Sequence, residues 1–525
     1  MTLPAYDCEL FNAADYFVDR HIREGREDKL AVICQDRSLT YGDLAYEMNR
    51  FGNALSSADV RIEDRVAMLM LDTEFFPIVF MGTIKIGAVP ICLNTMMRPK
   101  DYQYFLNDSR ARTLVVEASL YFNIERIRDE LHYLEEIVVV NGEAYGPGVT
   151  LYDDFITGQS HNLETAATCP DDPCFWLYSS GSTGKPKGTV HLQHDMVFSA
   201  ETYGKQVLEV CEDDICFSAA KLFFAYGLGN GLYLPFSVGG TSVLLPDRPT
   251  PDAVYNTIAR NHPTLYFGVP TLYGSMLTSG QGSFNGVRLC VSAGEALPAD
   301  IYFRWKERFN LDILDGIGST EITHIYISNR VDNIKPGTTG QIVPGYEAKI
   351  VDKDLNEVEE GEIGTLLIKG DSTAAYYWNK HEKTQKSMLG EWFNTDDKFY
   401  VDDQGFFYYV GRTNDMLKVG GIWVSPIEVE ACLIQHPSVL ECAVVPSHDS
   451  ENLVKPCAYI VLNKGYESSE VLEKEIKEYV KKELAHYKYP RWIRFVDDLP
   501  RTPTGKIKRF ELKKLEEDDL NVAWN

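Results

Sequence analysis

The stretch Tyr178-Ser-Ser-Gly-Ser-Thr-Gly-Lys-Pro-Lys-Gly188 decides the fold of this 525-residue chain. Small residues dominate it, so backbone N–H groups can close around an anion, and two lysines add positive charge. The apolar run Phe175–Tyr178 leads in like a buried strand, and a helical pattern follows from about Gln193. A strand, a glycine-rich loop and a helix are the usual construction of a phosphate cradle, whereas a flexible linker seldom follows so apolar a strand. We therefore predict that this loop binds phosphate.

Two better-known motifs do not account for the loop. It is not a Walker A loop, because no Gly-Lys-Ser/Thr falls at the required spacing. Ser182-Thr-Gly-Lys185 has the Ser-x-x-Lys pattern of penicillin-recognising enzymes. The companion Ser-Asp-Asn and Lys-Thr-Gly motifs of those enzymes do not occur, so the pattern does not support that assignment.

Composition indicates a cytoplasmic globular enzyme of three or four structural units. The longest apolar stretch, Val79–Leu93, is interrupted by Lys85 and is too short to span a bilayer. No export signal is recognised at the start of the chain. The eleven cysteines form no Cys-x-x-Cys pair, which is typical of reduced thiols rather than of disulfides or a zinc site.

The formal net charge of −26 predicts that neither nucleic acid nor an anionic membrane is a partner. An anionic ligand needs a local concentration of basic groups, and one occurs near the C-terminus. We interpret its first part, Lys474–Lys482, as a solvated helix face. The remaining basic residues flank a loop discussed below and are Lys488, Arg491, Arg494, Arg501, Lys506, Lys508 and Arg509.

The order of apolar patterns predicts an α/β fold. From Ala31 to about Glu117, strand-like runs alternate with helical ones such as Tyr41–Ser57, which indicates a largely parallel sheet. The same alternation recurs over 175–313. Between Gly337 and Val410 short alternating strands take over, and they favour a strand-rich part, such as a small barrel.

A second, smaller domain is predicted after the segment Gly411-Arg-Thr-Asn-Asp415. A hairpin at 416–424 is followed by Ser425-Pro-Ile-Glu428, a capping box that starts a helix. We expect strands at 439–445, 457–462 and 492–496, and a helix from about Ser469. The predicted organisation is a large N-terminal domain, 1–413, and a small C-terminal α/β domain, 414–525.

Five further segments occur along the chain in a fixed order. They are Ser292-Ala-Gly-Glu-Ala-Leu297, Gly316-Ile-Gly-Ser-Thr-Glu321, Trp392-Phe-Asn-Thr-Asp-Asp397, Gly411-Arg-x-x-Asp415 and Pro500-Arg-Thr-Pro-Thr-Gly-Lys506. Together with the glycine-rich loop, they resemble the adenylate-forming superfamily of acyl-CoA synthetases, peptide-synthetase adenylation domains and luciferases. The resemblance implies that ATP, Mg²⁺, coenzyme A and a small carboxylate are used, without a tightly bound organic cofactor. It also implies a monomer or a homodimer.

The same resemblance implies a nucleotide site. Thr320 would face the phosphate, and Glu321 would hold Mg²⁺, a hard cation that prefers oxygen ligands. Asp397 would bind the ribose hydroxyls, with Arg412 beside it, although Arg412 could instead form a salt bridge between domains. The chain departs from the family at Ile317, usually an aromatic residue, and at Asp396, usually glycine. The nucleotide-binding residues implied are Ser179, Ser180, Gly181, Ser182, Thr183, Gly184, Lys187, Glu295, Asp315, Gly316, Ile317, Thr320, Asp397 and Arg412.

Lys506 matches the adenylation lysine of the superfamily, and Thr183 and Glu321 complete the implied catalytic set. An ammonium that bridges the attacking carboxylate and the α-phosphate offsets the charge gathered in the transition state. The family's C-terminal domain swings between two reaction steps. Gly420 and Gly421 would line the tunnel for the pantetheine arm, and Asn414 would be the hinge, where relatives usually have aspartate.

The segment Ser218–Asn230 and the sequence around His324 resemble benzoate–CoA ligases and related aryl-CoA ligases. The acyl pocket that this resemblance implies consists of Ala225, Tyr226, Gly227, Ala293, Gly318, His324 and Ile325. Without the resemblance, Phe223, Phe224 and Tyr226 read as core residues and His324 as a hydrogen-bonded structural histidine. His191-x-x-His194 has helical metal-ligand spacing, but no third ligand accompanies it.

The leading functional hypothesis is an AMP-forming ligase that makes benzoyl-CoA by way of an acyl-adenylate. Hydroxybenzoate, aminobenzoate and a cyclohexene carboxylate remain alternative substrates. An aryl-acid adenylation enzyme that loads a carrier protein is an alternative from another class, and a non-catalytic nucleotide binder is a third. The retained set of Lys185, Lys187, Glu321, Asp397, Arg412 and Lys506 argues against the last of these.

Overall fold

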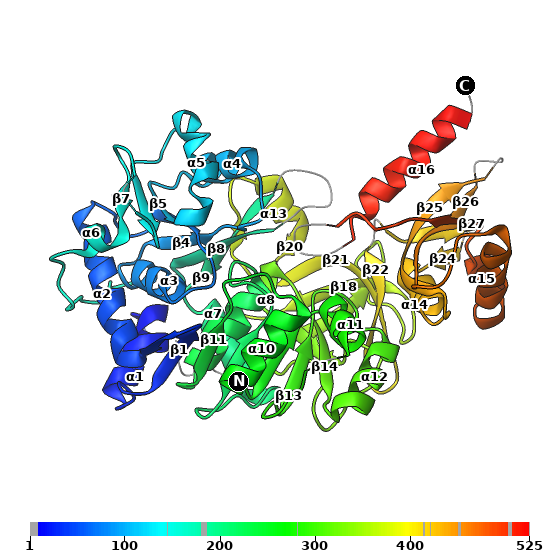
Figure 1. The fold of residues 1–525 in the computed structure, drawn as a ribbon, viewed down its shortest axis with the longest axis horizontal. Helices are drawn as coiled ribbons and strands as arrows, with labels where there is room; N and C mark the ends of the chain where they lie inside the picture. Colours follow the sequence, from blue (N-terminus) through cyan, green and yellow to red (C-terminus); the bar gives the residue numbers. More distant parts are fainter. Residues whose placement is uncertain are drawn as a thin grey trace. The chain divides into compact units, whose positions relative to one another are not determined.

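The computed structural model describes residues 9–143, 145–179, 186–280, 282–412, 415–419, 422–449, 453–501 and 507–523 (Figure 1). They cluster into two compact units. Unit 1 comprises Met1–Leu297, Ile301–Ala348 and Ile368–Phe393. Unit 2 comprises Pro298–Asp300, Lys349–Leu367 and Asn394–Asn525. The predicted α/β class is confirmed.

A nine-stranded sheet forms one half of unit 1, in the order β16-β15-β14-β13-β12-β10-β11-β1-β2. The pairs from β14 to β1 are parallel, as predicted, and β15, β16 and β2 pair antiparallel at the two edges. The carboxyl ends of β12, β13 and β14 therefore lie at one edge of the sheet, where ligands of α/β proteins bind. The strands are β1 (Leu30–Cys34), β2 (Arg37–Thr40), β10 (Ile215–Ser218), β11 (Thr241–Leu244), β12 (Leu265–Gly268), β13 (Leu289–Ser292), β14 (Ile313–Gly318), β15 (Ile325–Ser328) and β16 (Gln341–Ile342).

An eight-stranded sheet forms the other half of unit 1, in the order β19-β9-β8-β4-β3-β5-β6-β7. Its strands β3, β4, β5, β6 and β8 are parallel to their neighbours in this set. The apolar run of the sequence is the end of β8, so the predicted buried strand is confirmed. The strands are β3 (Arg65–Leu69), β4 (Val89–Cys92), β5 (Thr113–Glu117), β6 (Glu136–Val140), β7 (Thr150–Leu151), β8 (Pro173–Ser179), β9 (Lys187–Leu192) and β19 (Tyr376–Tyr377).

The element that follows the glycine-rich loop differs from the prediction. A strand, β9, comes first and pairs antiparallel with β8, so that Ser179 lies opposite Lys187. The helix α7 (Asp195–Ser199) begins only after this strand. The β9 residues 188–191 are all buried, so the strand shows no alternation of apolar and polar residues. The helical pattern that was recognised starts near Gln193, after this strand, and therefore did not indicate it. The loop thus connects two strands and is not the start of a helix.

The long apolar stretch of the sequence is explained by burial inside unit 1. It begins within helix α3 (Phe75–Lys85), which is buried along almost its whole length, and continues into β4. Lys85 itself is buried, and its ammonium lies 2.8 Å from the carboxylate of Asp19. Helix α2 (Tyr41–Ser57) forms where it was predicted and begins with a capping box at Thr40. Among the described residues, no helix combines the length and apolarity that a bilayer crossing needs.

The remaining helices cover the sheets or connect their strands. They are α1 (Arg20–Arg23), α4 (Pro99–Ser109), α5 (Phe122–Glu125), α6 (Tyr152–Ile156), α8 (Ala225–Leu228), α9 (Leu234–Phe236), α10 (Pro251–Asn261), α11 (Pro270–Ser279), α12 (Ala299–Phe309) and α13 (His381–Ser387).

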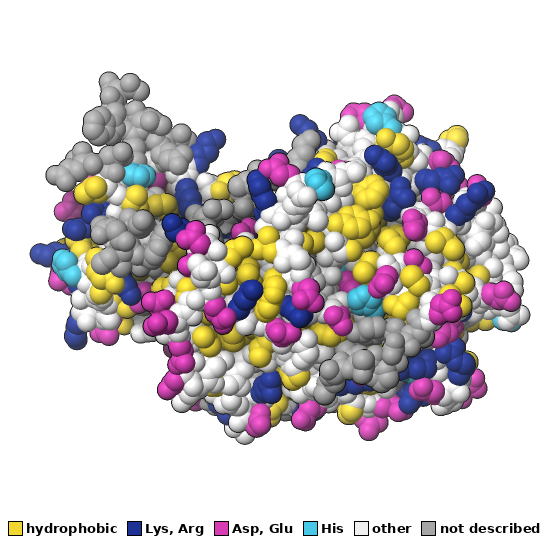
Figure 2. Space-filling model, turned by 180° about the vertical axis from the view of Figure 1, so that it is seen from behind, with side chains coloured by type: hydrophobic (Ala, Val, Ile, Leu, Met, Phe, Trp, Pro, Cys, Tyr) yellow, Lys and Arg dark blue, Asp and Glu magenta, His cyan; other side chains and the backbone are white. Residues whose placement is uncertain are grey.

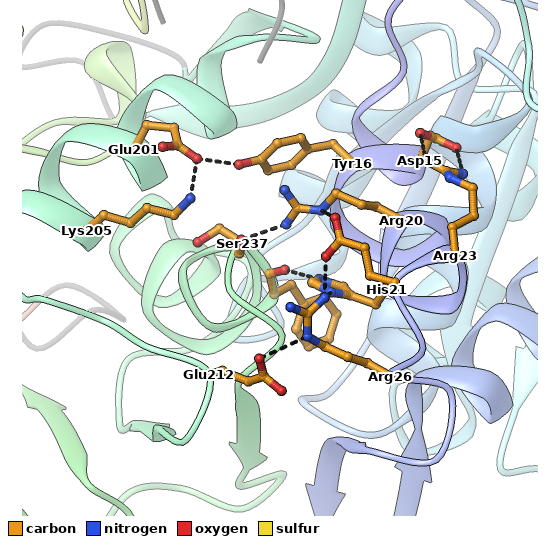
Figure 3. Close-up of polar contacts among 12 residues, drawn as sticks. Asp15, Tyr16, Arg20, His21, Arg23, Arg26, Glu201, Lys205, Glu212 and Ser237 are labelled. Carbon is orange, nitrogen blue, oxygen red and sulfur yellow. Dashed lines mark hydrogen bonds and ion pairs between the residues drawn. The ribbon is translucent and has the colours of Figure 1, made fainter. Parts of the chain in front are cut away.

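Polar contacts tie the N-terminal helical segment to the helices of the nine-stranded sheet (Figure 3). The hydroxyl of Tyr16 donates to the carboxylate of Glu201, which lies in the π-helical turn Ala200–Gly204. The guanidinium of Arg20 donates to the carbonyl of Ser237 at 2.7 Å. Burial and the adjacent Glu201 raise the pKa of Tyr16, so its phenol stays protonated as a donor. This network holds the π-helical turn in place. The same turn contains Tyr203, whose ring faces the candidate pocket described below.

Unit 2 contains most of a five-stranded sheet and a separate α/β part. The α/β part has a three-stranded sheet, β25-β26-β27, as predicted, and a hairpin of β23 with β24. At the predicted capping box, the Ser425 hydroxyl accepts the N–H of Glu428. The elements of the five-stranded sheet, whose strand β20 belongs to unit 1, and of the α/β part are β17 (Glu347–Val351), β18 (Gly364–Lys369), β20 (Met388–Leu389), β21 (Trp392–Val401), β22 (Phe407–Arg412), β23 (Leu417–Val419), β24 (Ile422–Val424), α14 (Pro426–Ile434), β25 (Val439–His448), β26 (Val454–Leu462), α15 (Glu470–Glu483), β27 (Trp492–Phe495) and α16 (Arg509–Ala523).

The surface carries both signs of charge. On the face seen in Figure 2, acidic and basic side chains of the described residues are interspersed with apolar ones. They do not gather there into a continuous basic stripe of the kind that follows a nucleic-acid backbone.

Candidate functional site

Three side chains of the eight-stranded sheet converge on one carboxylate oxygen, Oε1 of Glu321. The hydroxyl of Ser179 donates at 3.1 Å, the ammonium of Lys187 at 3.1 Å and the hydroxyl of Tyr377 at 2.8 Å. Glu321 itself lies in a 3₁₀ turn, Thr320–Ile322, that follows β14 of the nine-stranded sheet. The carboxylate therefore joins the two sheets of unit 1 and contacts Ser179 and Lys187, which flank the glycine-rich loop.

The cluster keeps Glu321 ionised although it is buried. Burial alone would raise the pKa of Glu321, but the ammonium of Lys187 and the hydrogen bond from Tyr377 outweigh this effect and lower the pKa. Lys187 also lies 4.0 Å from the centre of the Tyr377 ring, an additional attraction for the cation. The three donors share Oε1. Among the described residues, no side-chain donor contacts the other carboxylate oxygen. Such a carboxylate fits a Mg²⁺ ligand.

Tyr377 was not predicted from the sequence. It comes from the two-residue strand β19, which pairs with β9 so that Tyr377 lies opposite Thr189. No motif surrounds it, and its position depends entirely on the pairing of strands far apart in the chain. Lys187 was predicted to bind the nucleotide, and in this structure it is paired with Glu321.

Several predicted site residues lie outside the described residues. Ser179 and Lys187, which flank the glycine-rich loop, are described. The predicted residues outside the described ranges are Ser180, Gly181, Ser182, Thr183, Gly184, Asn414, Gly420, Gly421 and Lys506.

The ends of β13 and β14 bring together the predicted residues of the second nucleotide motif. Asp315 is buried, and its Oδ2 accepts the N–H of Leu297 at 3.2 Å. Burial raises the pKa of Asp315 well above its usual range, although hydrogen bonds from the backbone of Leu297 and Gly316 oppose this. Gly316 and Ile317 follow it on β14, and Glu295 lies just beyond β13. The hydrogen bond from Leu297 fixes the Asp315 side chain at the end of β14.

An aromatic cage surrounds the predicted pocket histidine, His324. Its ring centre lies 5.2 Å from that of Tyr203, 5.8 Å from that of Tyr226 and 6.0 Å from that of Tyr233. The hydroxyl of Tyr226 donates to the carbonyl of Val291 at 3.1 Å. Because this hydrogen bond fixes the hydroxyl to the end of β13, a ligand would contact the flat ring of Tyr226.

His324 is held neutral and without hydrogen bonds from its ring. Burial lowers the pKa of His324 to about 3, although the backbone of Tyr226 opposes this slightly. Neither ring nitrogen has a hydrogen-bond partner among the described residues. The amide of Asn230, which is fully buried, likewise has neither polar atom in a hydrogen bond there. Burial raises the pKa of Tyr226, and the nearby Asn230 side chain opposes this. Asn230 was not predicted, because an asparagine between two glycines gives no sign of lying near Tyr226.

Two of the predicted pocket glycines are required by close backbone approaches. A Cβ on Gly318 would lie 2.5 Å from the carbonyl oxygen of His324, and one on Gly227 would lie 2.0 Å from that of Lys221. Both distances exclude any side chain. The predicted small or apolar wall residues Ala225, Ala293 and Ile325 are buried.

The His191-x-x-His194 spacing has a different use from metal binding. The ring of His191 is fully buried, and its Nδ1 lies 2.7 Å from Oδ2 of Asp195. Its Nε2 lies 2.8 Å from the carbonyl oxygen of Thr320. His191 therefore contacts the backbone of the residue before Glu321.

In unit 2, the predicted ribose-binding pair lies on neighbouring strands. Asp397 on β21 is opposite Arg412 on β22, and Nε of Arg412 lies 3.3 Å from Oδ1 of Asp397. The adjacent Asp396 stands where the family has glycine, and its φ is +60°. A left-handed backbone explains the usual glycine, and aspartate is among the few other residues that adopt it readily.

This chain is similar to known enzymes along most of its length. Residues 18–378 match the AMP-binding enzyme family, and residues 428–506 match the AMP-binding enzyme C-terminal domain. The benzoate–CoA ligase of Thauera aromatica is 49% identical over 510 residues, which cover 96% of each chain. The 4-hydroxybenzoate–CoA/benzoate–CoA ligase of Rhodopseudomonas palustris is 44% identical over 96% of this chain and 94% of its own.

A solved structure resembles the whole chain. The anthranilate–CoA ligase AuaEII, in complex with anthranoyl-AMP, matches with a TM-score of 0.94 and 43% identity, covering 99% of each chain. The family matches, these relatives and the order of the motifs along the chain all indicate the same family. The chain therefore belongs to the AMP-binding enzyme family, that is, to the adenylate-forming superfamily.

Proposed function

We propose that this protein is an ATP-dependent, AMP-forming ligase that converts an aryl carboxylate to its CoA thioester. The observation that carries the proposal is the buried, ionised Glu321 and its three donors in a member of this family; two of these donors, Ser179 and Lys187, flank the glycine-rich loop. The relatives named above are ligases of benzoate, 4-hydroxybenzoate or anthranilate, which supports a ring acid as the substrate.

In the first step, a carboxylate oxygen of the acid bonds to the α-phosphorus of ATP, and the bond to pyrophosphate breaks. Glu321 would hold the Mg²⁺ ion, which when bound neutralises phosphate charge. Lys187 and Tyr377 keep this carboxylate ionised and oriented. We assign the bridging ammonium to Lys506 and the phosphate contacts to Thr183 and Thr320.

In the second step, the thiolate of CoA attacks the acyl carbon and AMP leaves with the oxygen it gained. We propose that residues 1–413 and 414–525 form the two functional domains and that the smaller one reorients about Asn414. This motion would exchange Lys506 for a hairpin containing Gly420 and Gly421, where any side chain would obstruct the pantetheine arm. Asp397 and Arg412 would bind the ribose.

The flat aromatic cage favours a planar ring, so benzoate is our first choice of substrate. One observation favours a second candidate, a ring acid with a polar substituent such as hydroxybenzoate or aminobenzoate. His324 and Asn230 present unpartnered polar atoms in a buried site, and leaving such atoms unpaired is unfavourable by about 1–3 kcal/mol each. A hydroxyl or amino group on the ring could pair with them.

ATP–pyrophosphate exchange across a panel of acids tests the proposal. The panel contains benzoate, hydroxybenzoates, aminobenzoates, a cyclohexene carboxylate, acetate and a medium-chain fatty acid. Exchange that peaks on benzoate supports the first choice, and exchange that peaks on a substituted ring supports the second. Absence of exchange with every ring acid would contradict the function. Formation of the thioester with free CoA then separates a CoA ligase from an enzyme that loads a carrier protein.

We also propose a cytoplasmic location and a monomer or homodimer. Fractionation of cells and light scattering of the purified protein test these two points.

A further inference from the structure

The backbone between Glu321 and His324 is strained. Thr323 has φ +67° and ψ −47°, and the N–H of His324 donates to the carbonyl of Ile322 at 2.7 Å. This combination is a γ-turn of the rare positive-φ type. A β-branched residue such as threonine is seldom found with positive φ. Such a conformation persists only where the surrounding structure enforces it, and it occurs most often at functional sites.

Side chains from three separate segments enforce this turn. The hydroxyl of Thr323 donates to the carbonyl of Ser372 at 2.8 Å and lies 3.1 Å from Nδ1 of His191. The hydroxyl of Ser372 in turn donates to the carbonyl of Ile322 at 3.0 Å. His191 also reaches the carbonyl of Thr320. We call His191, Thr323 and Ser372 the clamp.

The clamp is fully enclosed. The three residues that form it are each at most 1% exposed, as is Asp195, which lies against Nδ1 of His191. The ring of His191 stacks on that of Phe175, with the centres 4.7 Å apart. Since β8 and β9 supply Phe175 and His191, the clamp fixes the turn to the eight-stranded sheet.

The turn separates two groups with different tasks. Immediately before it, Glu321 receives Ser179, Lys187 and Tyr377 and would hold the metal ion. Immediately after it, His324 enters the aromatic cage that would receive the ring acid. Because one γ-turn lies between these side chains, a change in its shape displaces both of them.

We infer that His191 and Thr323 are positioning residues that couple the metal-binding carboxylate to the acyl pocket. This inference rests on the proposed function. It assigns a role in both sites to residues that contact neither ligand. Loss of the clamp lets the strained turn relax, which moves Glu321 and His324 together and leaves the later step with CoA unaffected.

The test replaces Thr323 with valine, which keeps the shape and the β-branch and removes only the hydroxyl. In ATP–pyrophosphate exchange, Thr323→Val should raise the KM for Mg²⁺ and the KM for the ring acid together, each by roughly tenfold. The KM for CoA, measured with preformed aryl-adenylate, should stay within twofold. Thr323→Ser, which restores the hydroxyl, should recover both constants.

Thr83→Val is the matched control. Thr83 is also fully buried, and its hydroxyl donates to the Val79 carbonyl within helix α3 at 2.7 Å, in the same unit. It should reproduce any general loss of stability without changing either KM. His191→Gln provides a second disruption of the clamp if Thr323→Val does not fold, with the same paired rise expected.

Three outcomes would overturn the inference. One is a Thr323→Val or His191→Gln variant whose two KM values match those of Thr83→Val. Another is a change in only one of the two constants, and the third is an equal change in the KM for CoA. A wild-type protein without exchange would instead refute the proposed function itself, so the two failures are distinguishable.

Discussion

Replacement of Lys187 by methionine isolates the electrostatic support of Glu321. Methionine keeps much of the side-chain volume and removes the ammonium, which lies 3.1 Å from Oε1 in a pair whose side chains are only 12% and 11% exposed. At an effective dielectric constant of about 20, the attraction at this distance is about 5 kcal/mol. Removal of one partner from a buried pair typically destabilises a protein by about 3–5 kcal/mol, because the other charge remains buried.

The sign of the pH dependence follows from the same contacts. In the wild type the pKa of Glu321 is lowered, so its contribution to stability is present above the pKa of the unfolded chain and is lost only in acid. In Lys187→Met, burial is no longer opposed by the ammonium, and the pKa of Glu321 rises. The variant should therefore be most destabilised at pH 8 and less so as the pH falls and Glu321 becomes protonated. The acidic limb of pyrophosphate exchange should move to higher pH.

Thermal unfolding between pH 5 and pH 8, together with the pH profile of exchange, measures both effects. Lys205→Met is the matched control, because Lys205 also pairs with a glutamate, Glu201, at 2.6 Å but is more exposed (Figure 3). A pair of that kind contributes about 0–1 kcal/mol, so the control should lose little stability. The reasoning is refuted if Lys187→Met unfolds like the control at pH 8 or keeps the wild-type acidic limb.

Substitutions at four other positions give separate tests. Tyr377→Phe removes the 2.8 Å donor to Glu321, so titration of exchange activity should require roughly tenfold more Mg²⁺; an unchanged requirement would remove Tyr377 from the site. Asp396→Gly should unfold at or above the wild-type temperature, because φ is +60° there, whereas Asp396→Val should unfold lower; the reverse order would contradict the left-handed backbone. Lys506→Ala should abolish exchange yet still convert synthetic benzoyl-adenylate and CoA to the thioester, and Gly421→Leu should do the opposite; equal loss of both activities in either variant would contradict separate roles for these residues.

Most of the fold could be predicted because local pattern and environment agree. The helix Tyr41–Ser57 and the strands around Arg65 and Phe175 carry clear apolar periodicity. Strand β9 was missed because both of its faces are buried and it follows a loop that usually precedes a helix. The strand order of the two large sheets is set by pairing between distant segments, which a single sequence does not encode locally.

The candidate site divides in the same way. Glu321, Asp397 and Arg412 were predicted because they lie in motifs that resemble those of the family. Tyr377, Asn230 and the clamp could not be found, because each acts through a contact between segments far apart in the chain. Asp396 is intermediate: the sequence revealed the departure from glycine, and only the positive φ explains why aspartate is accepted there.

If a carboxylate of the ring acid attacks the α-phosphate of ATP, one oxygen of that carboxylate is transferred to AMP. Isotopic labelling of the carboxylate follows this transfer. The protein is incubated with ATP, CoA and ring acids labelled with ¹⁸O in the carboxylate, and the products are analysed by mass spectrometry. One labelled oxygen should appear in AMP for each thioester formed. Label in inorganic phosphate, with ADP as the nucleotide product, would show attack on the γ-phosphate and contradict the account.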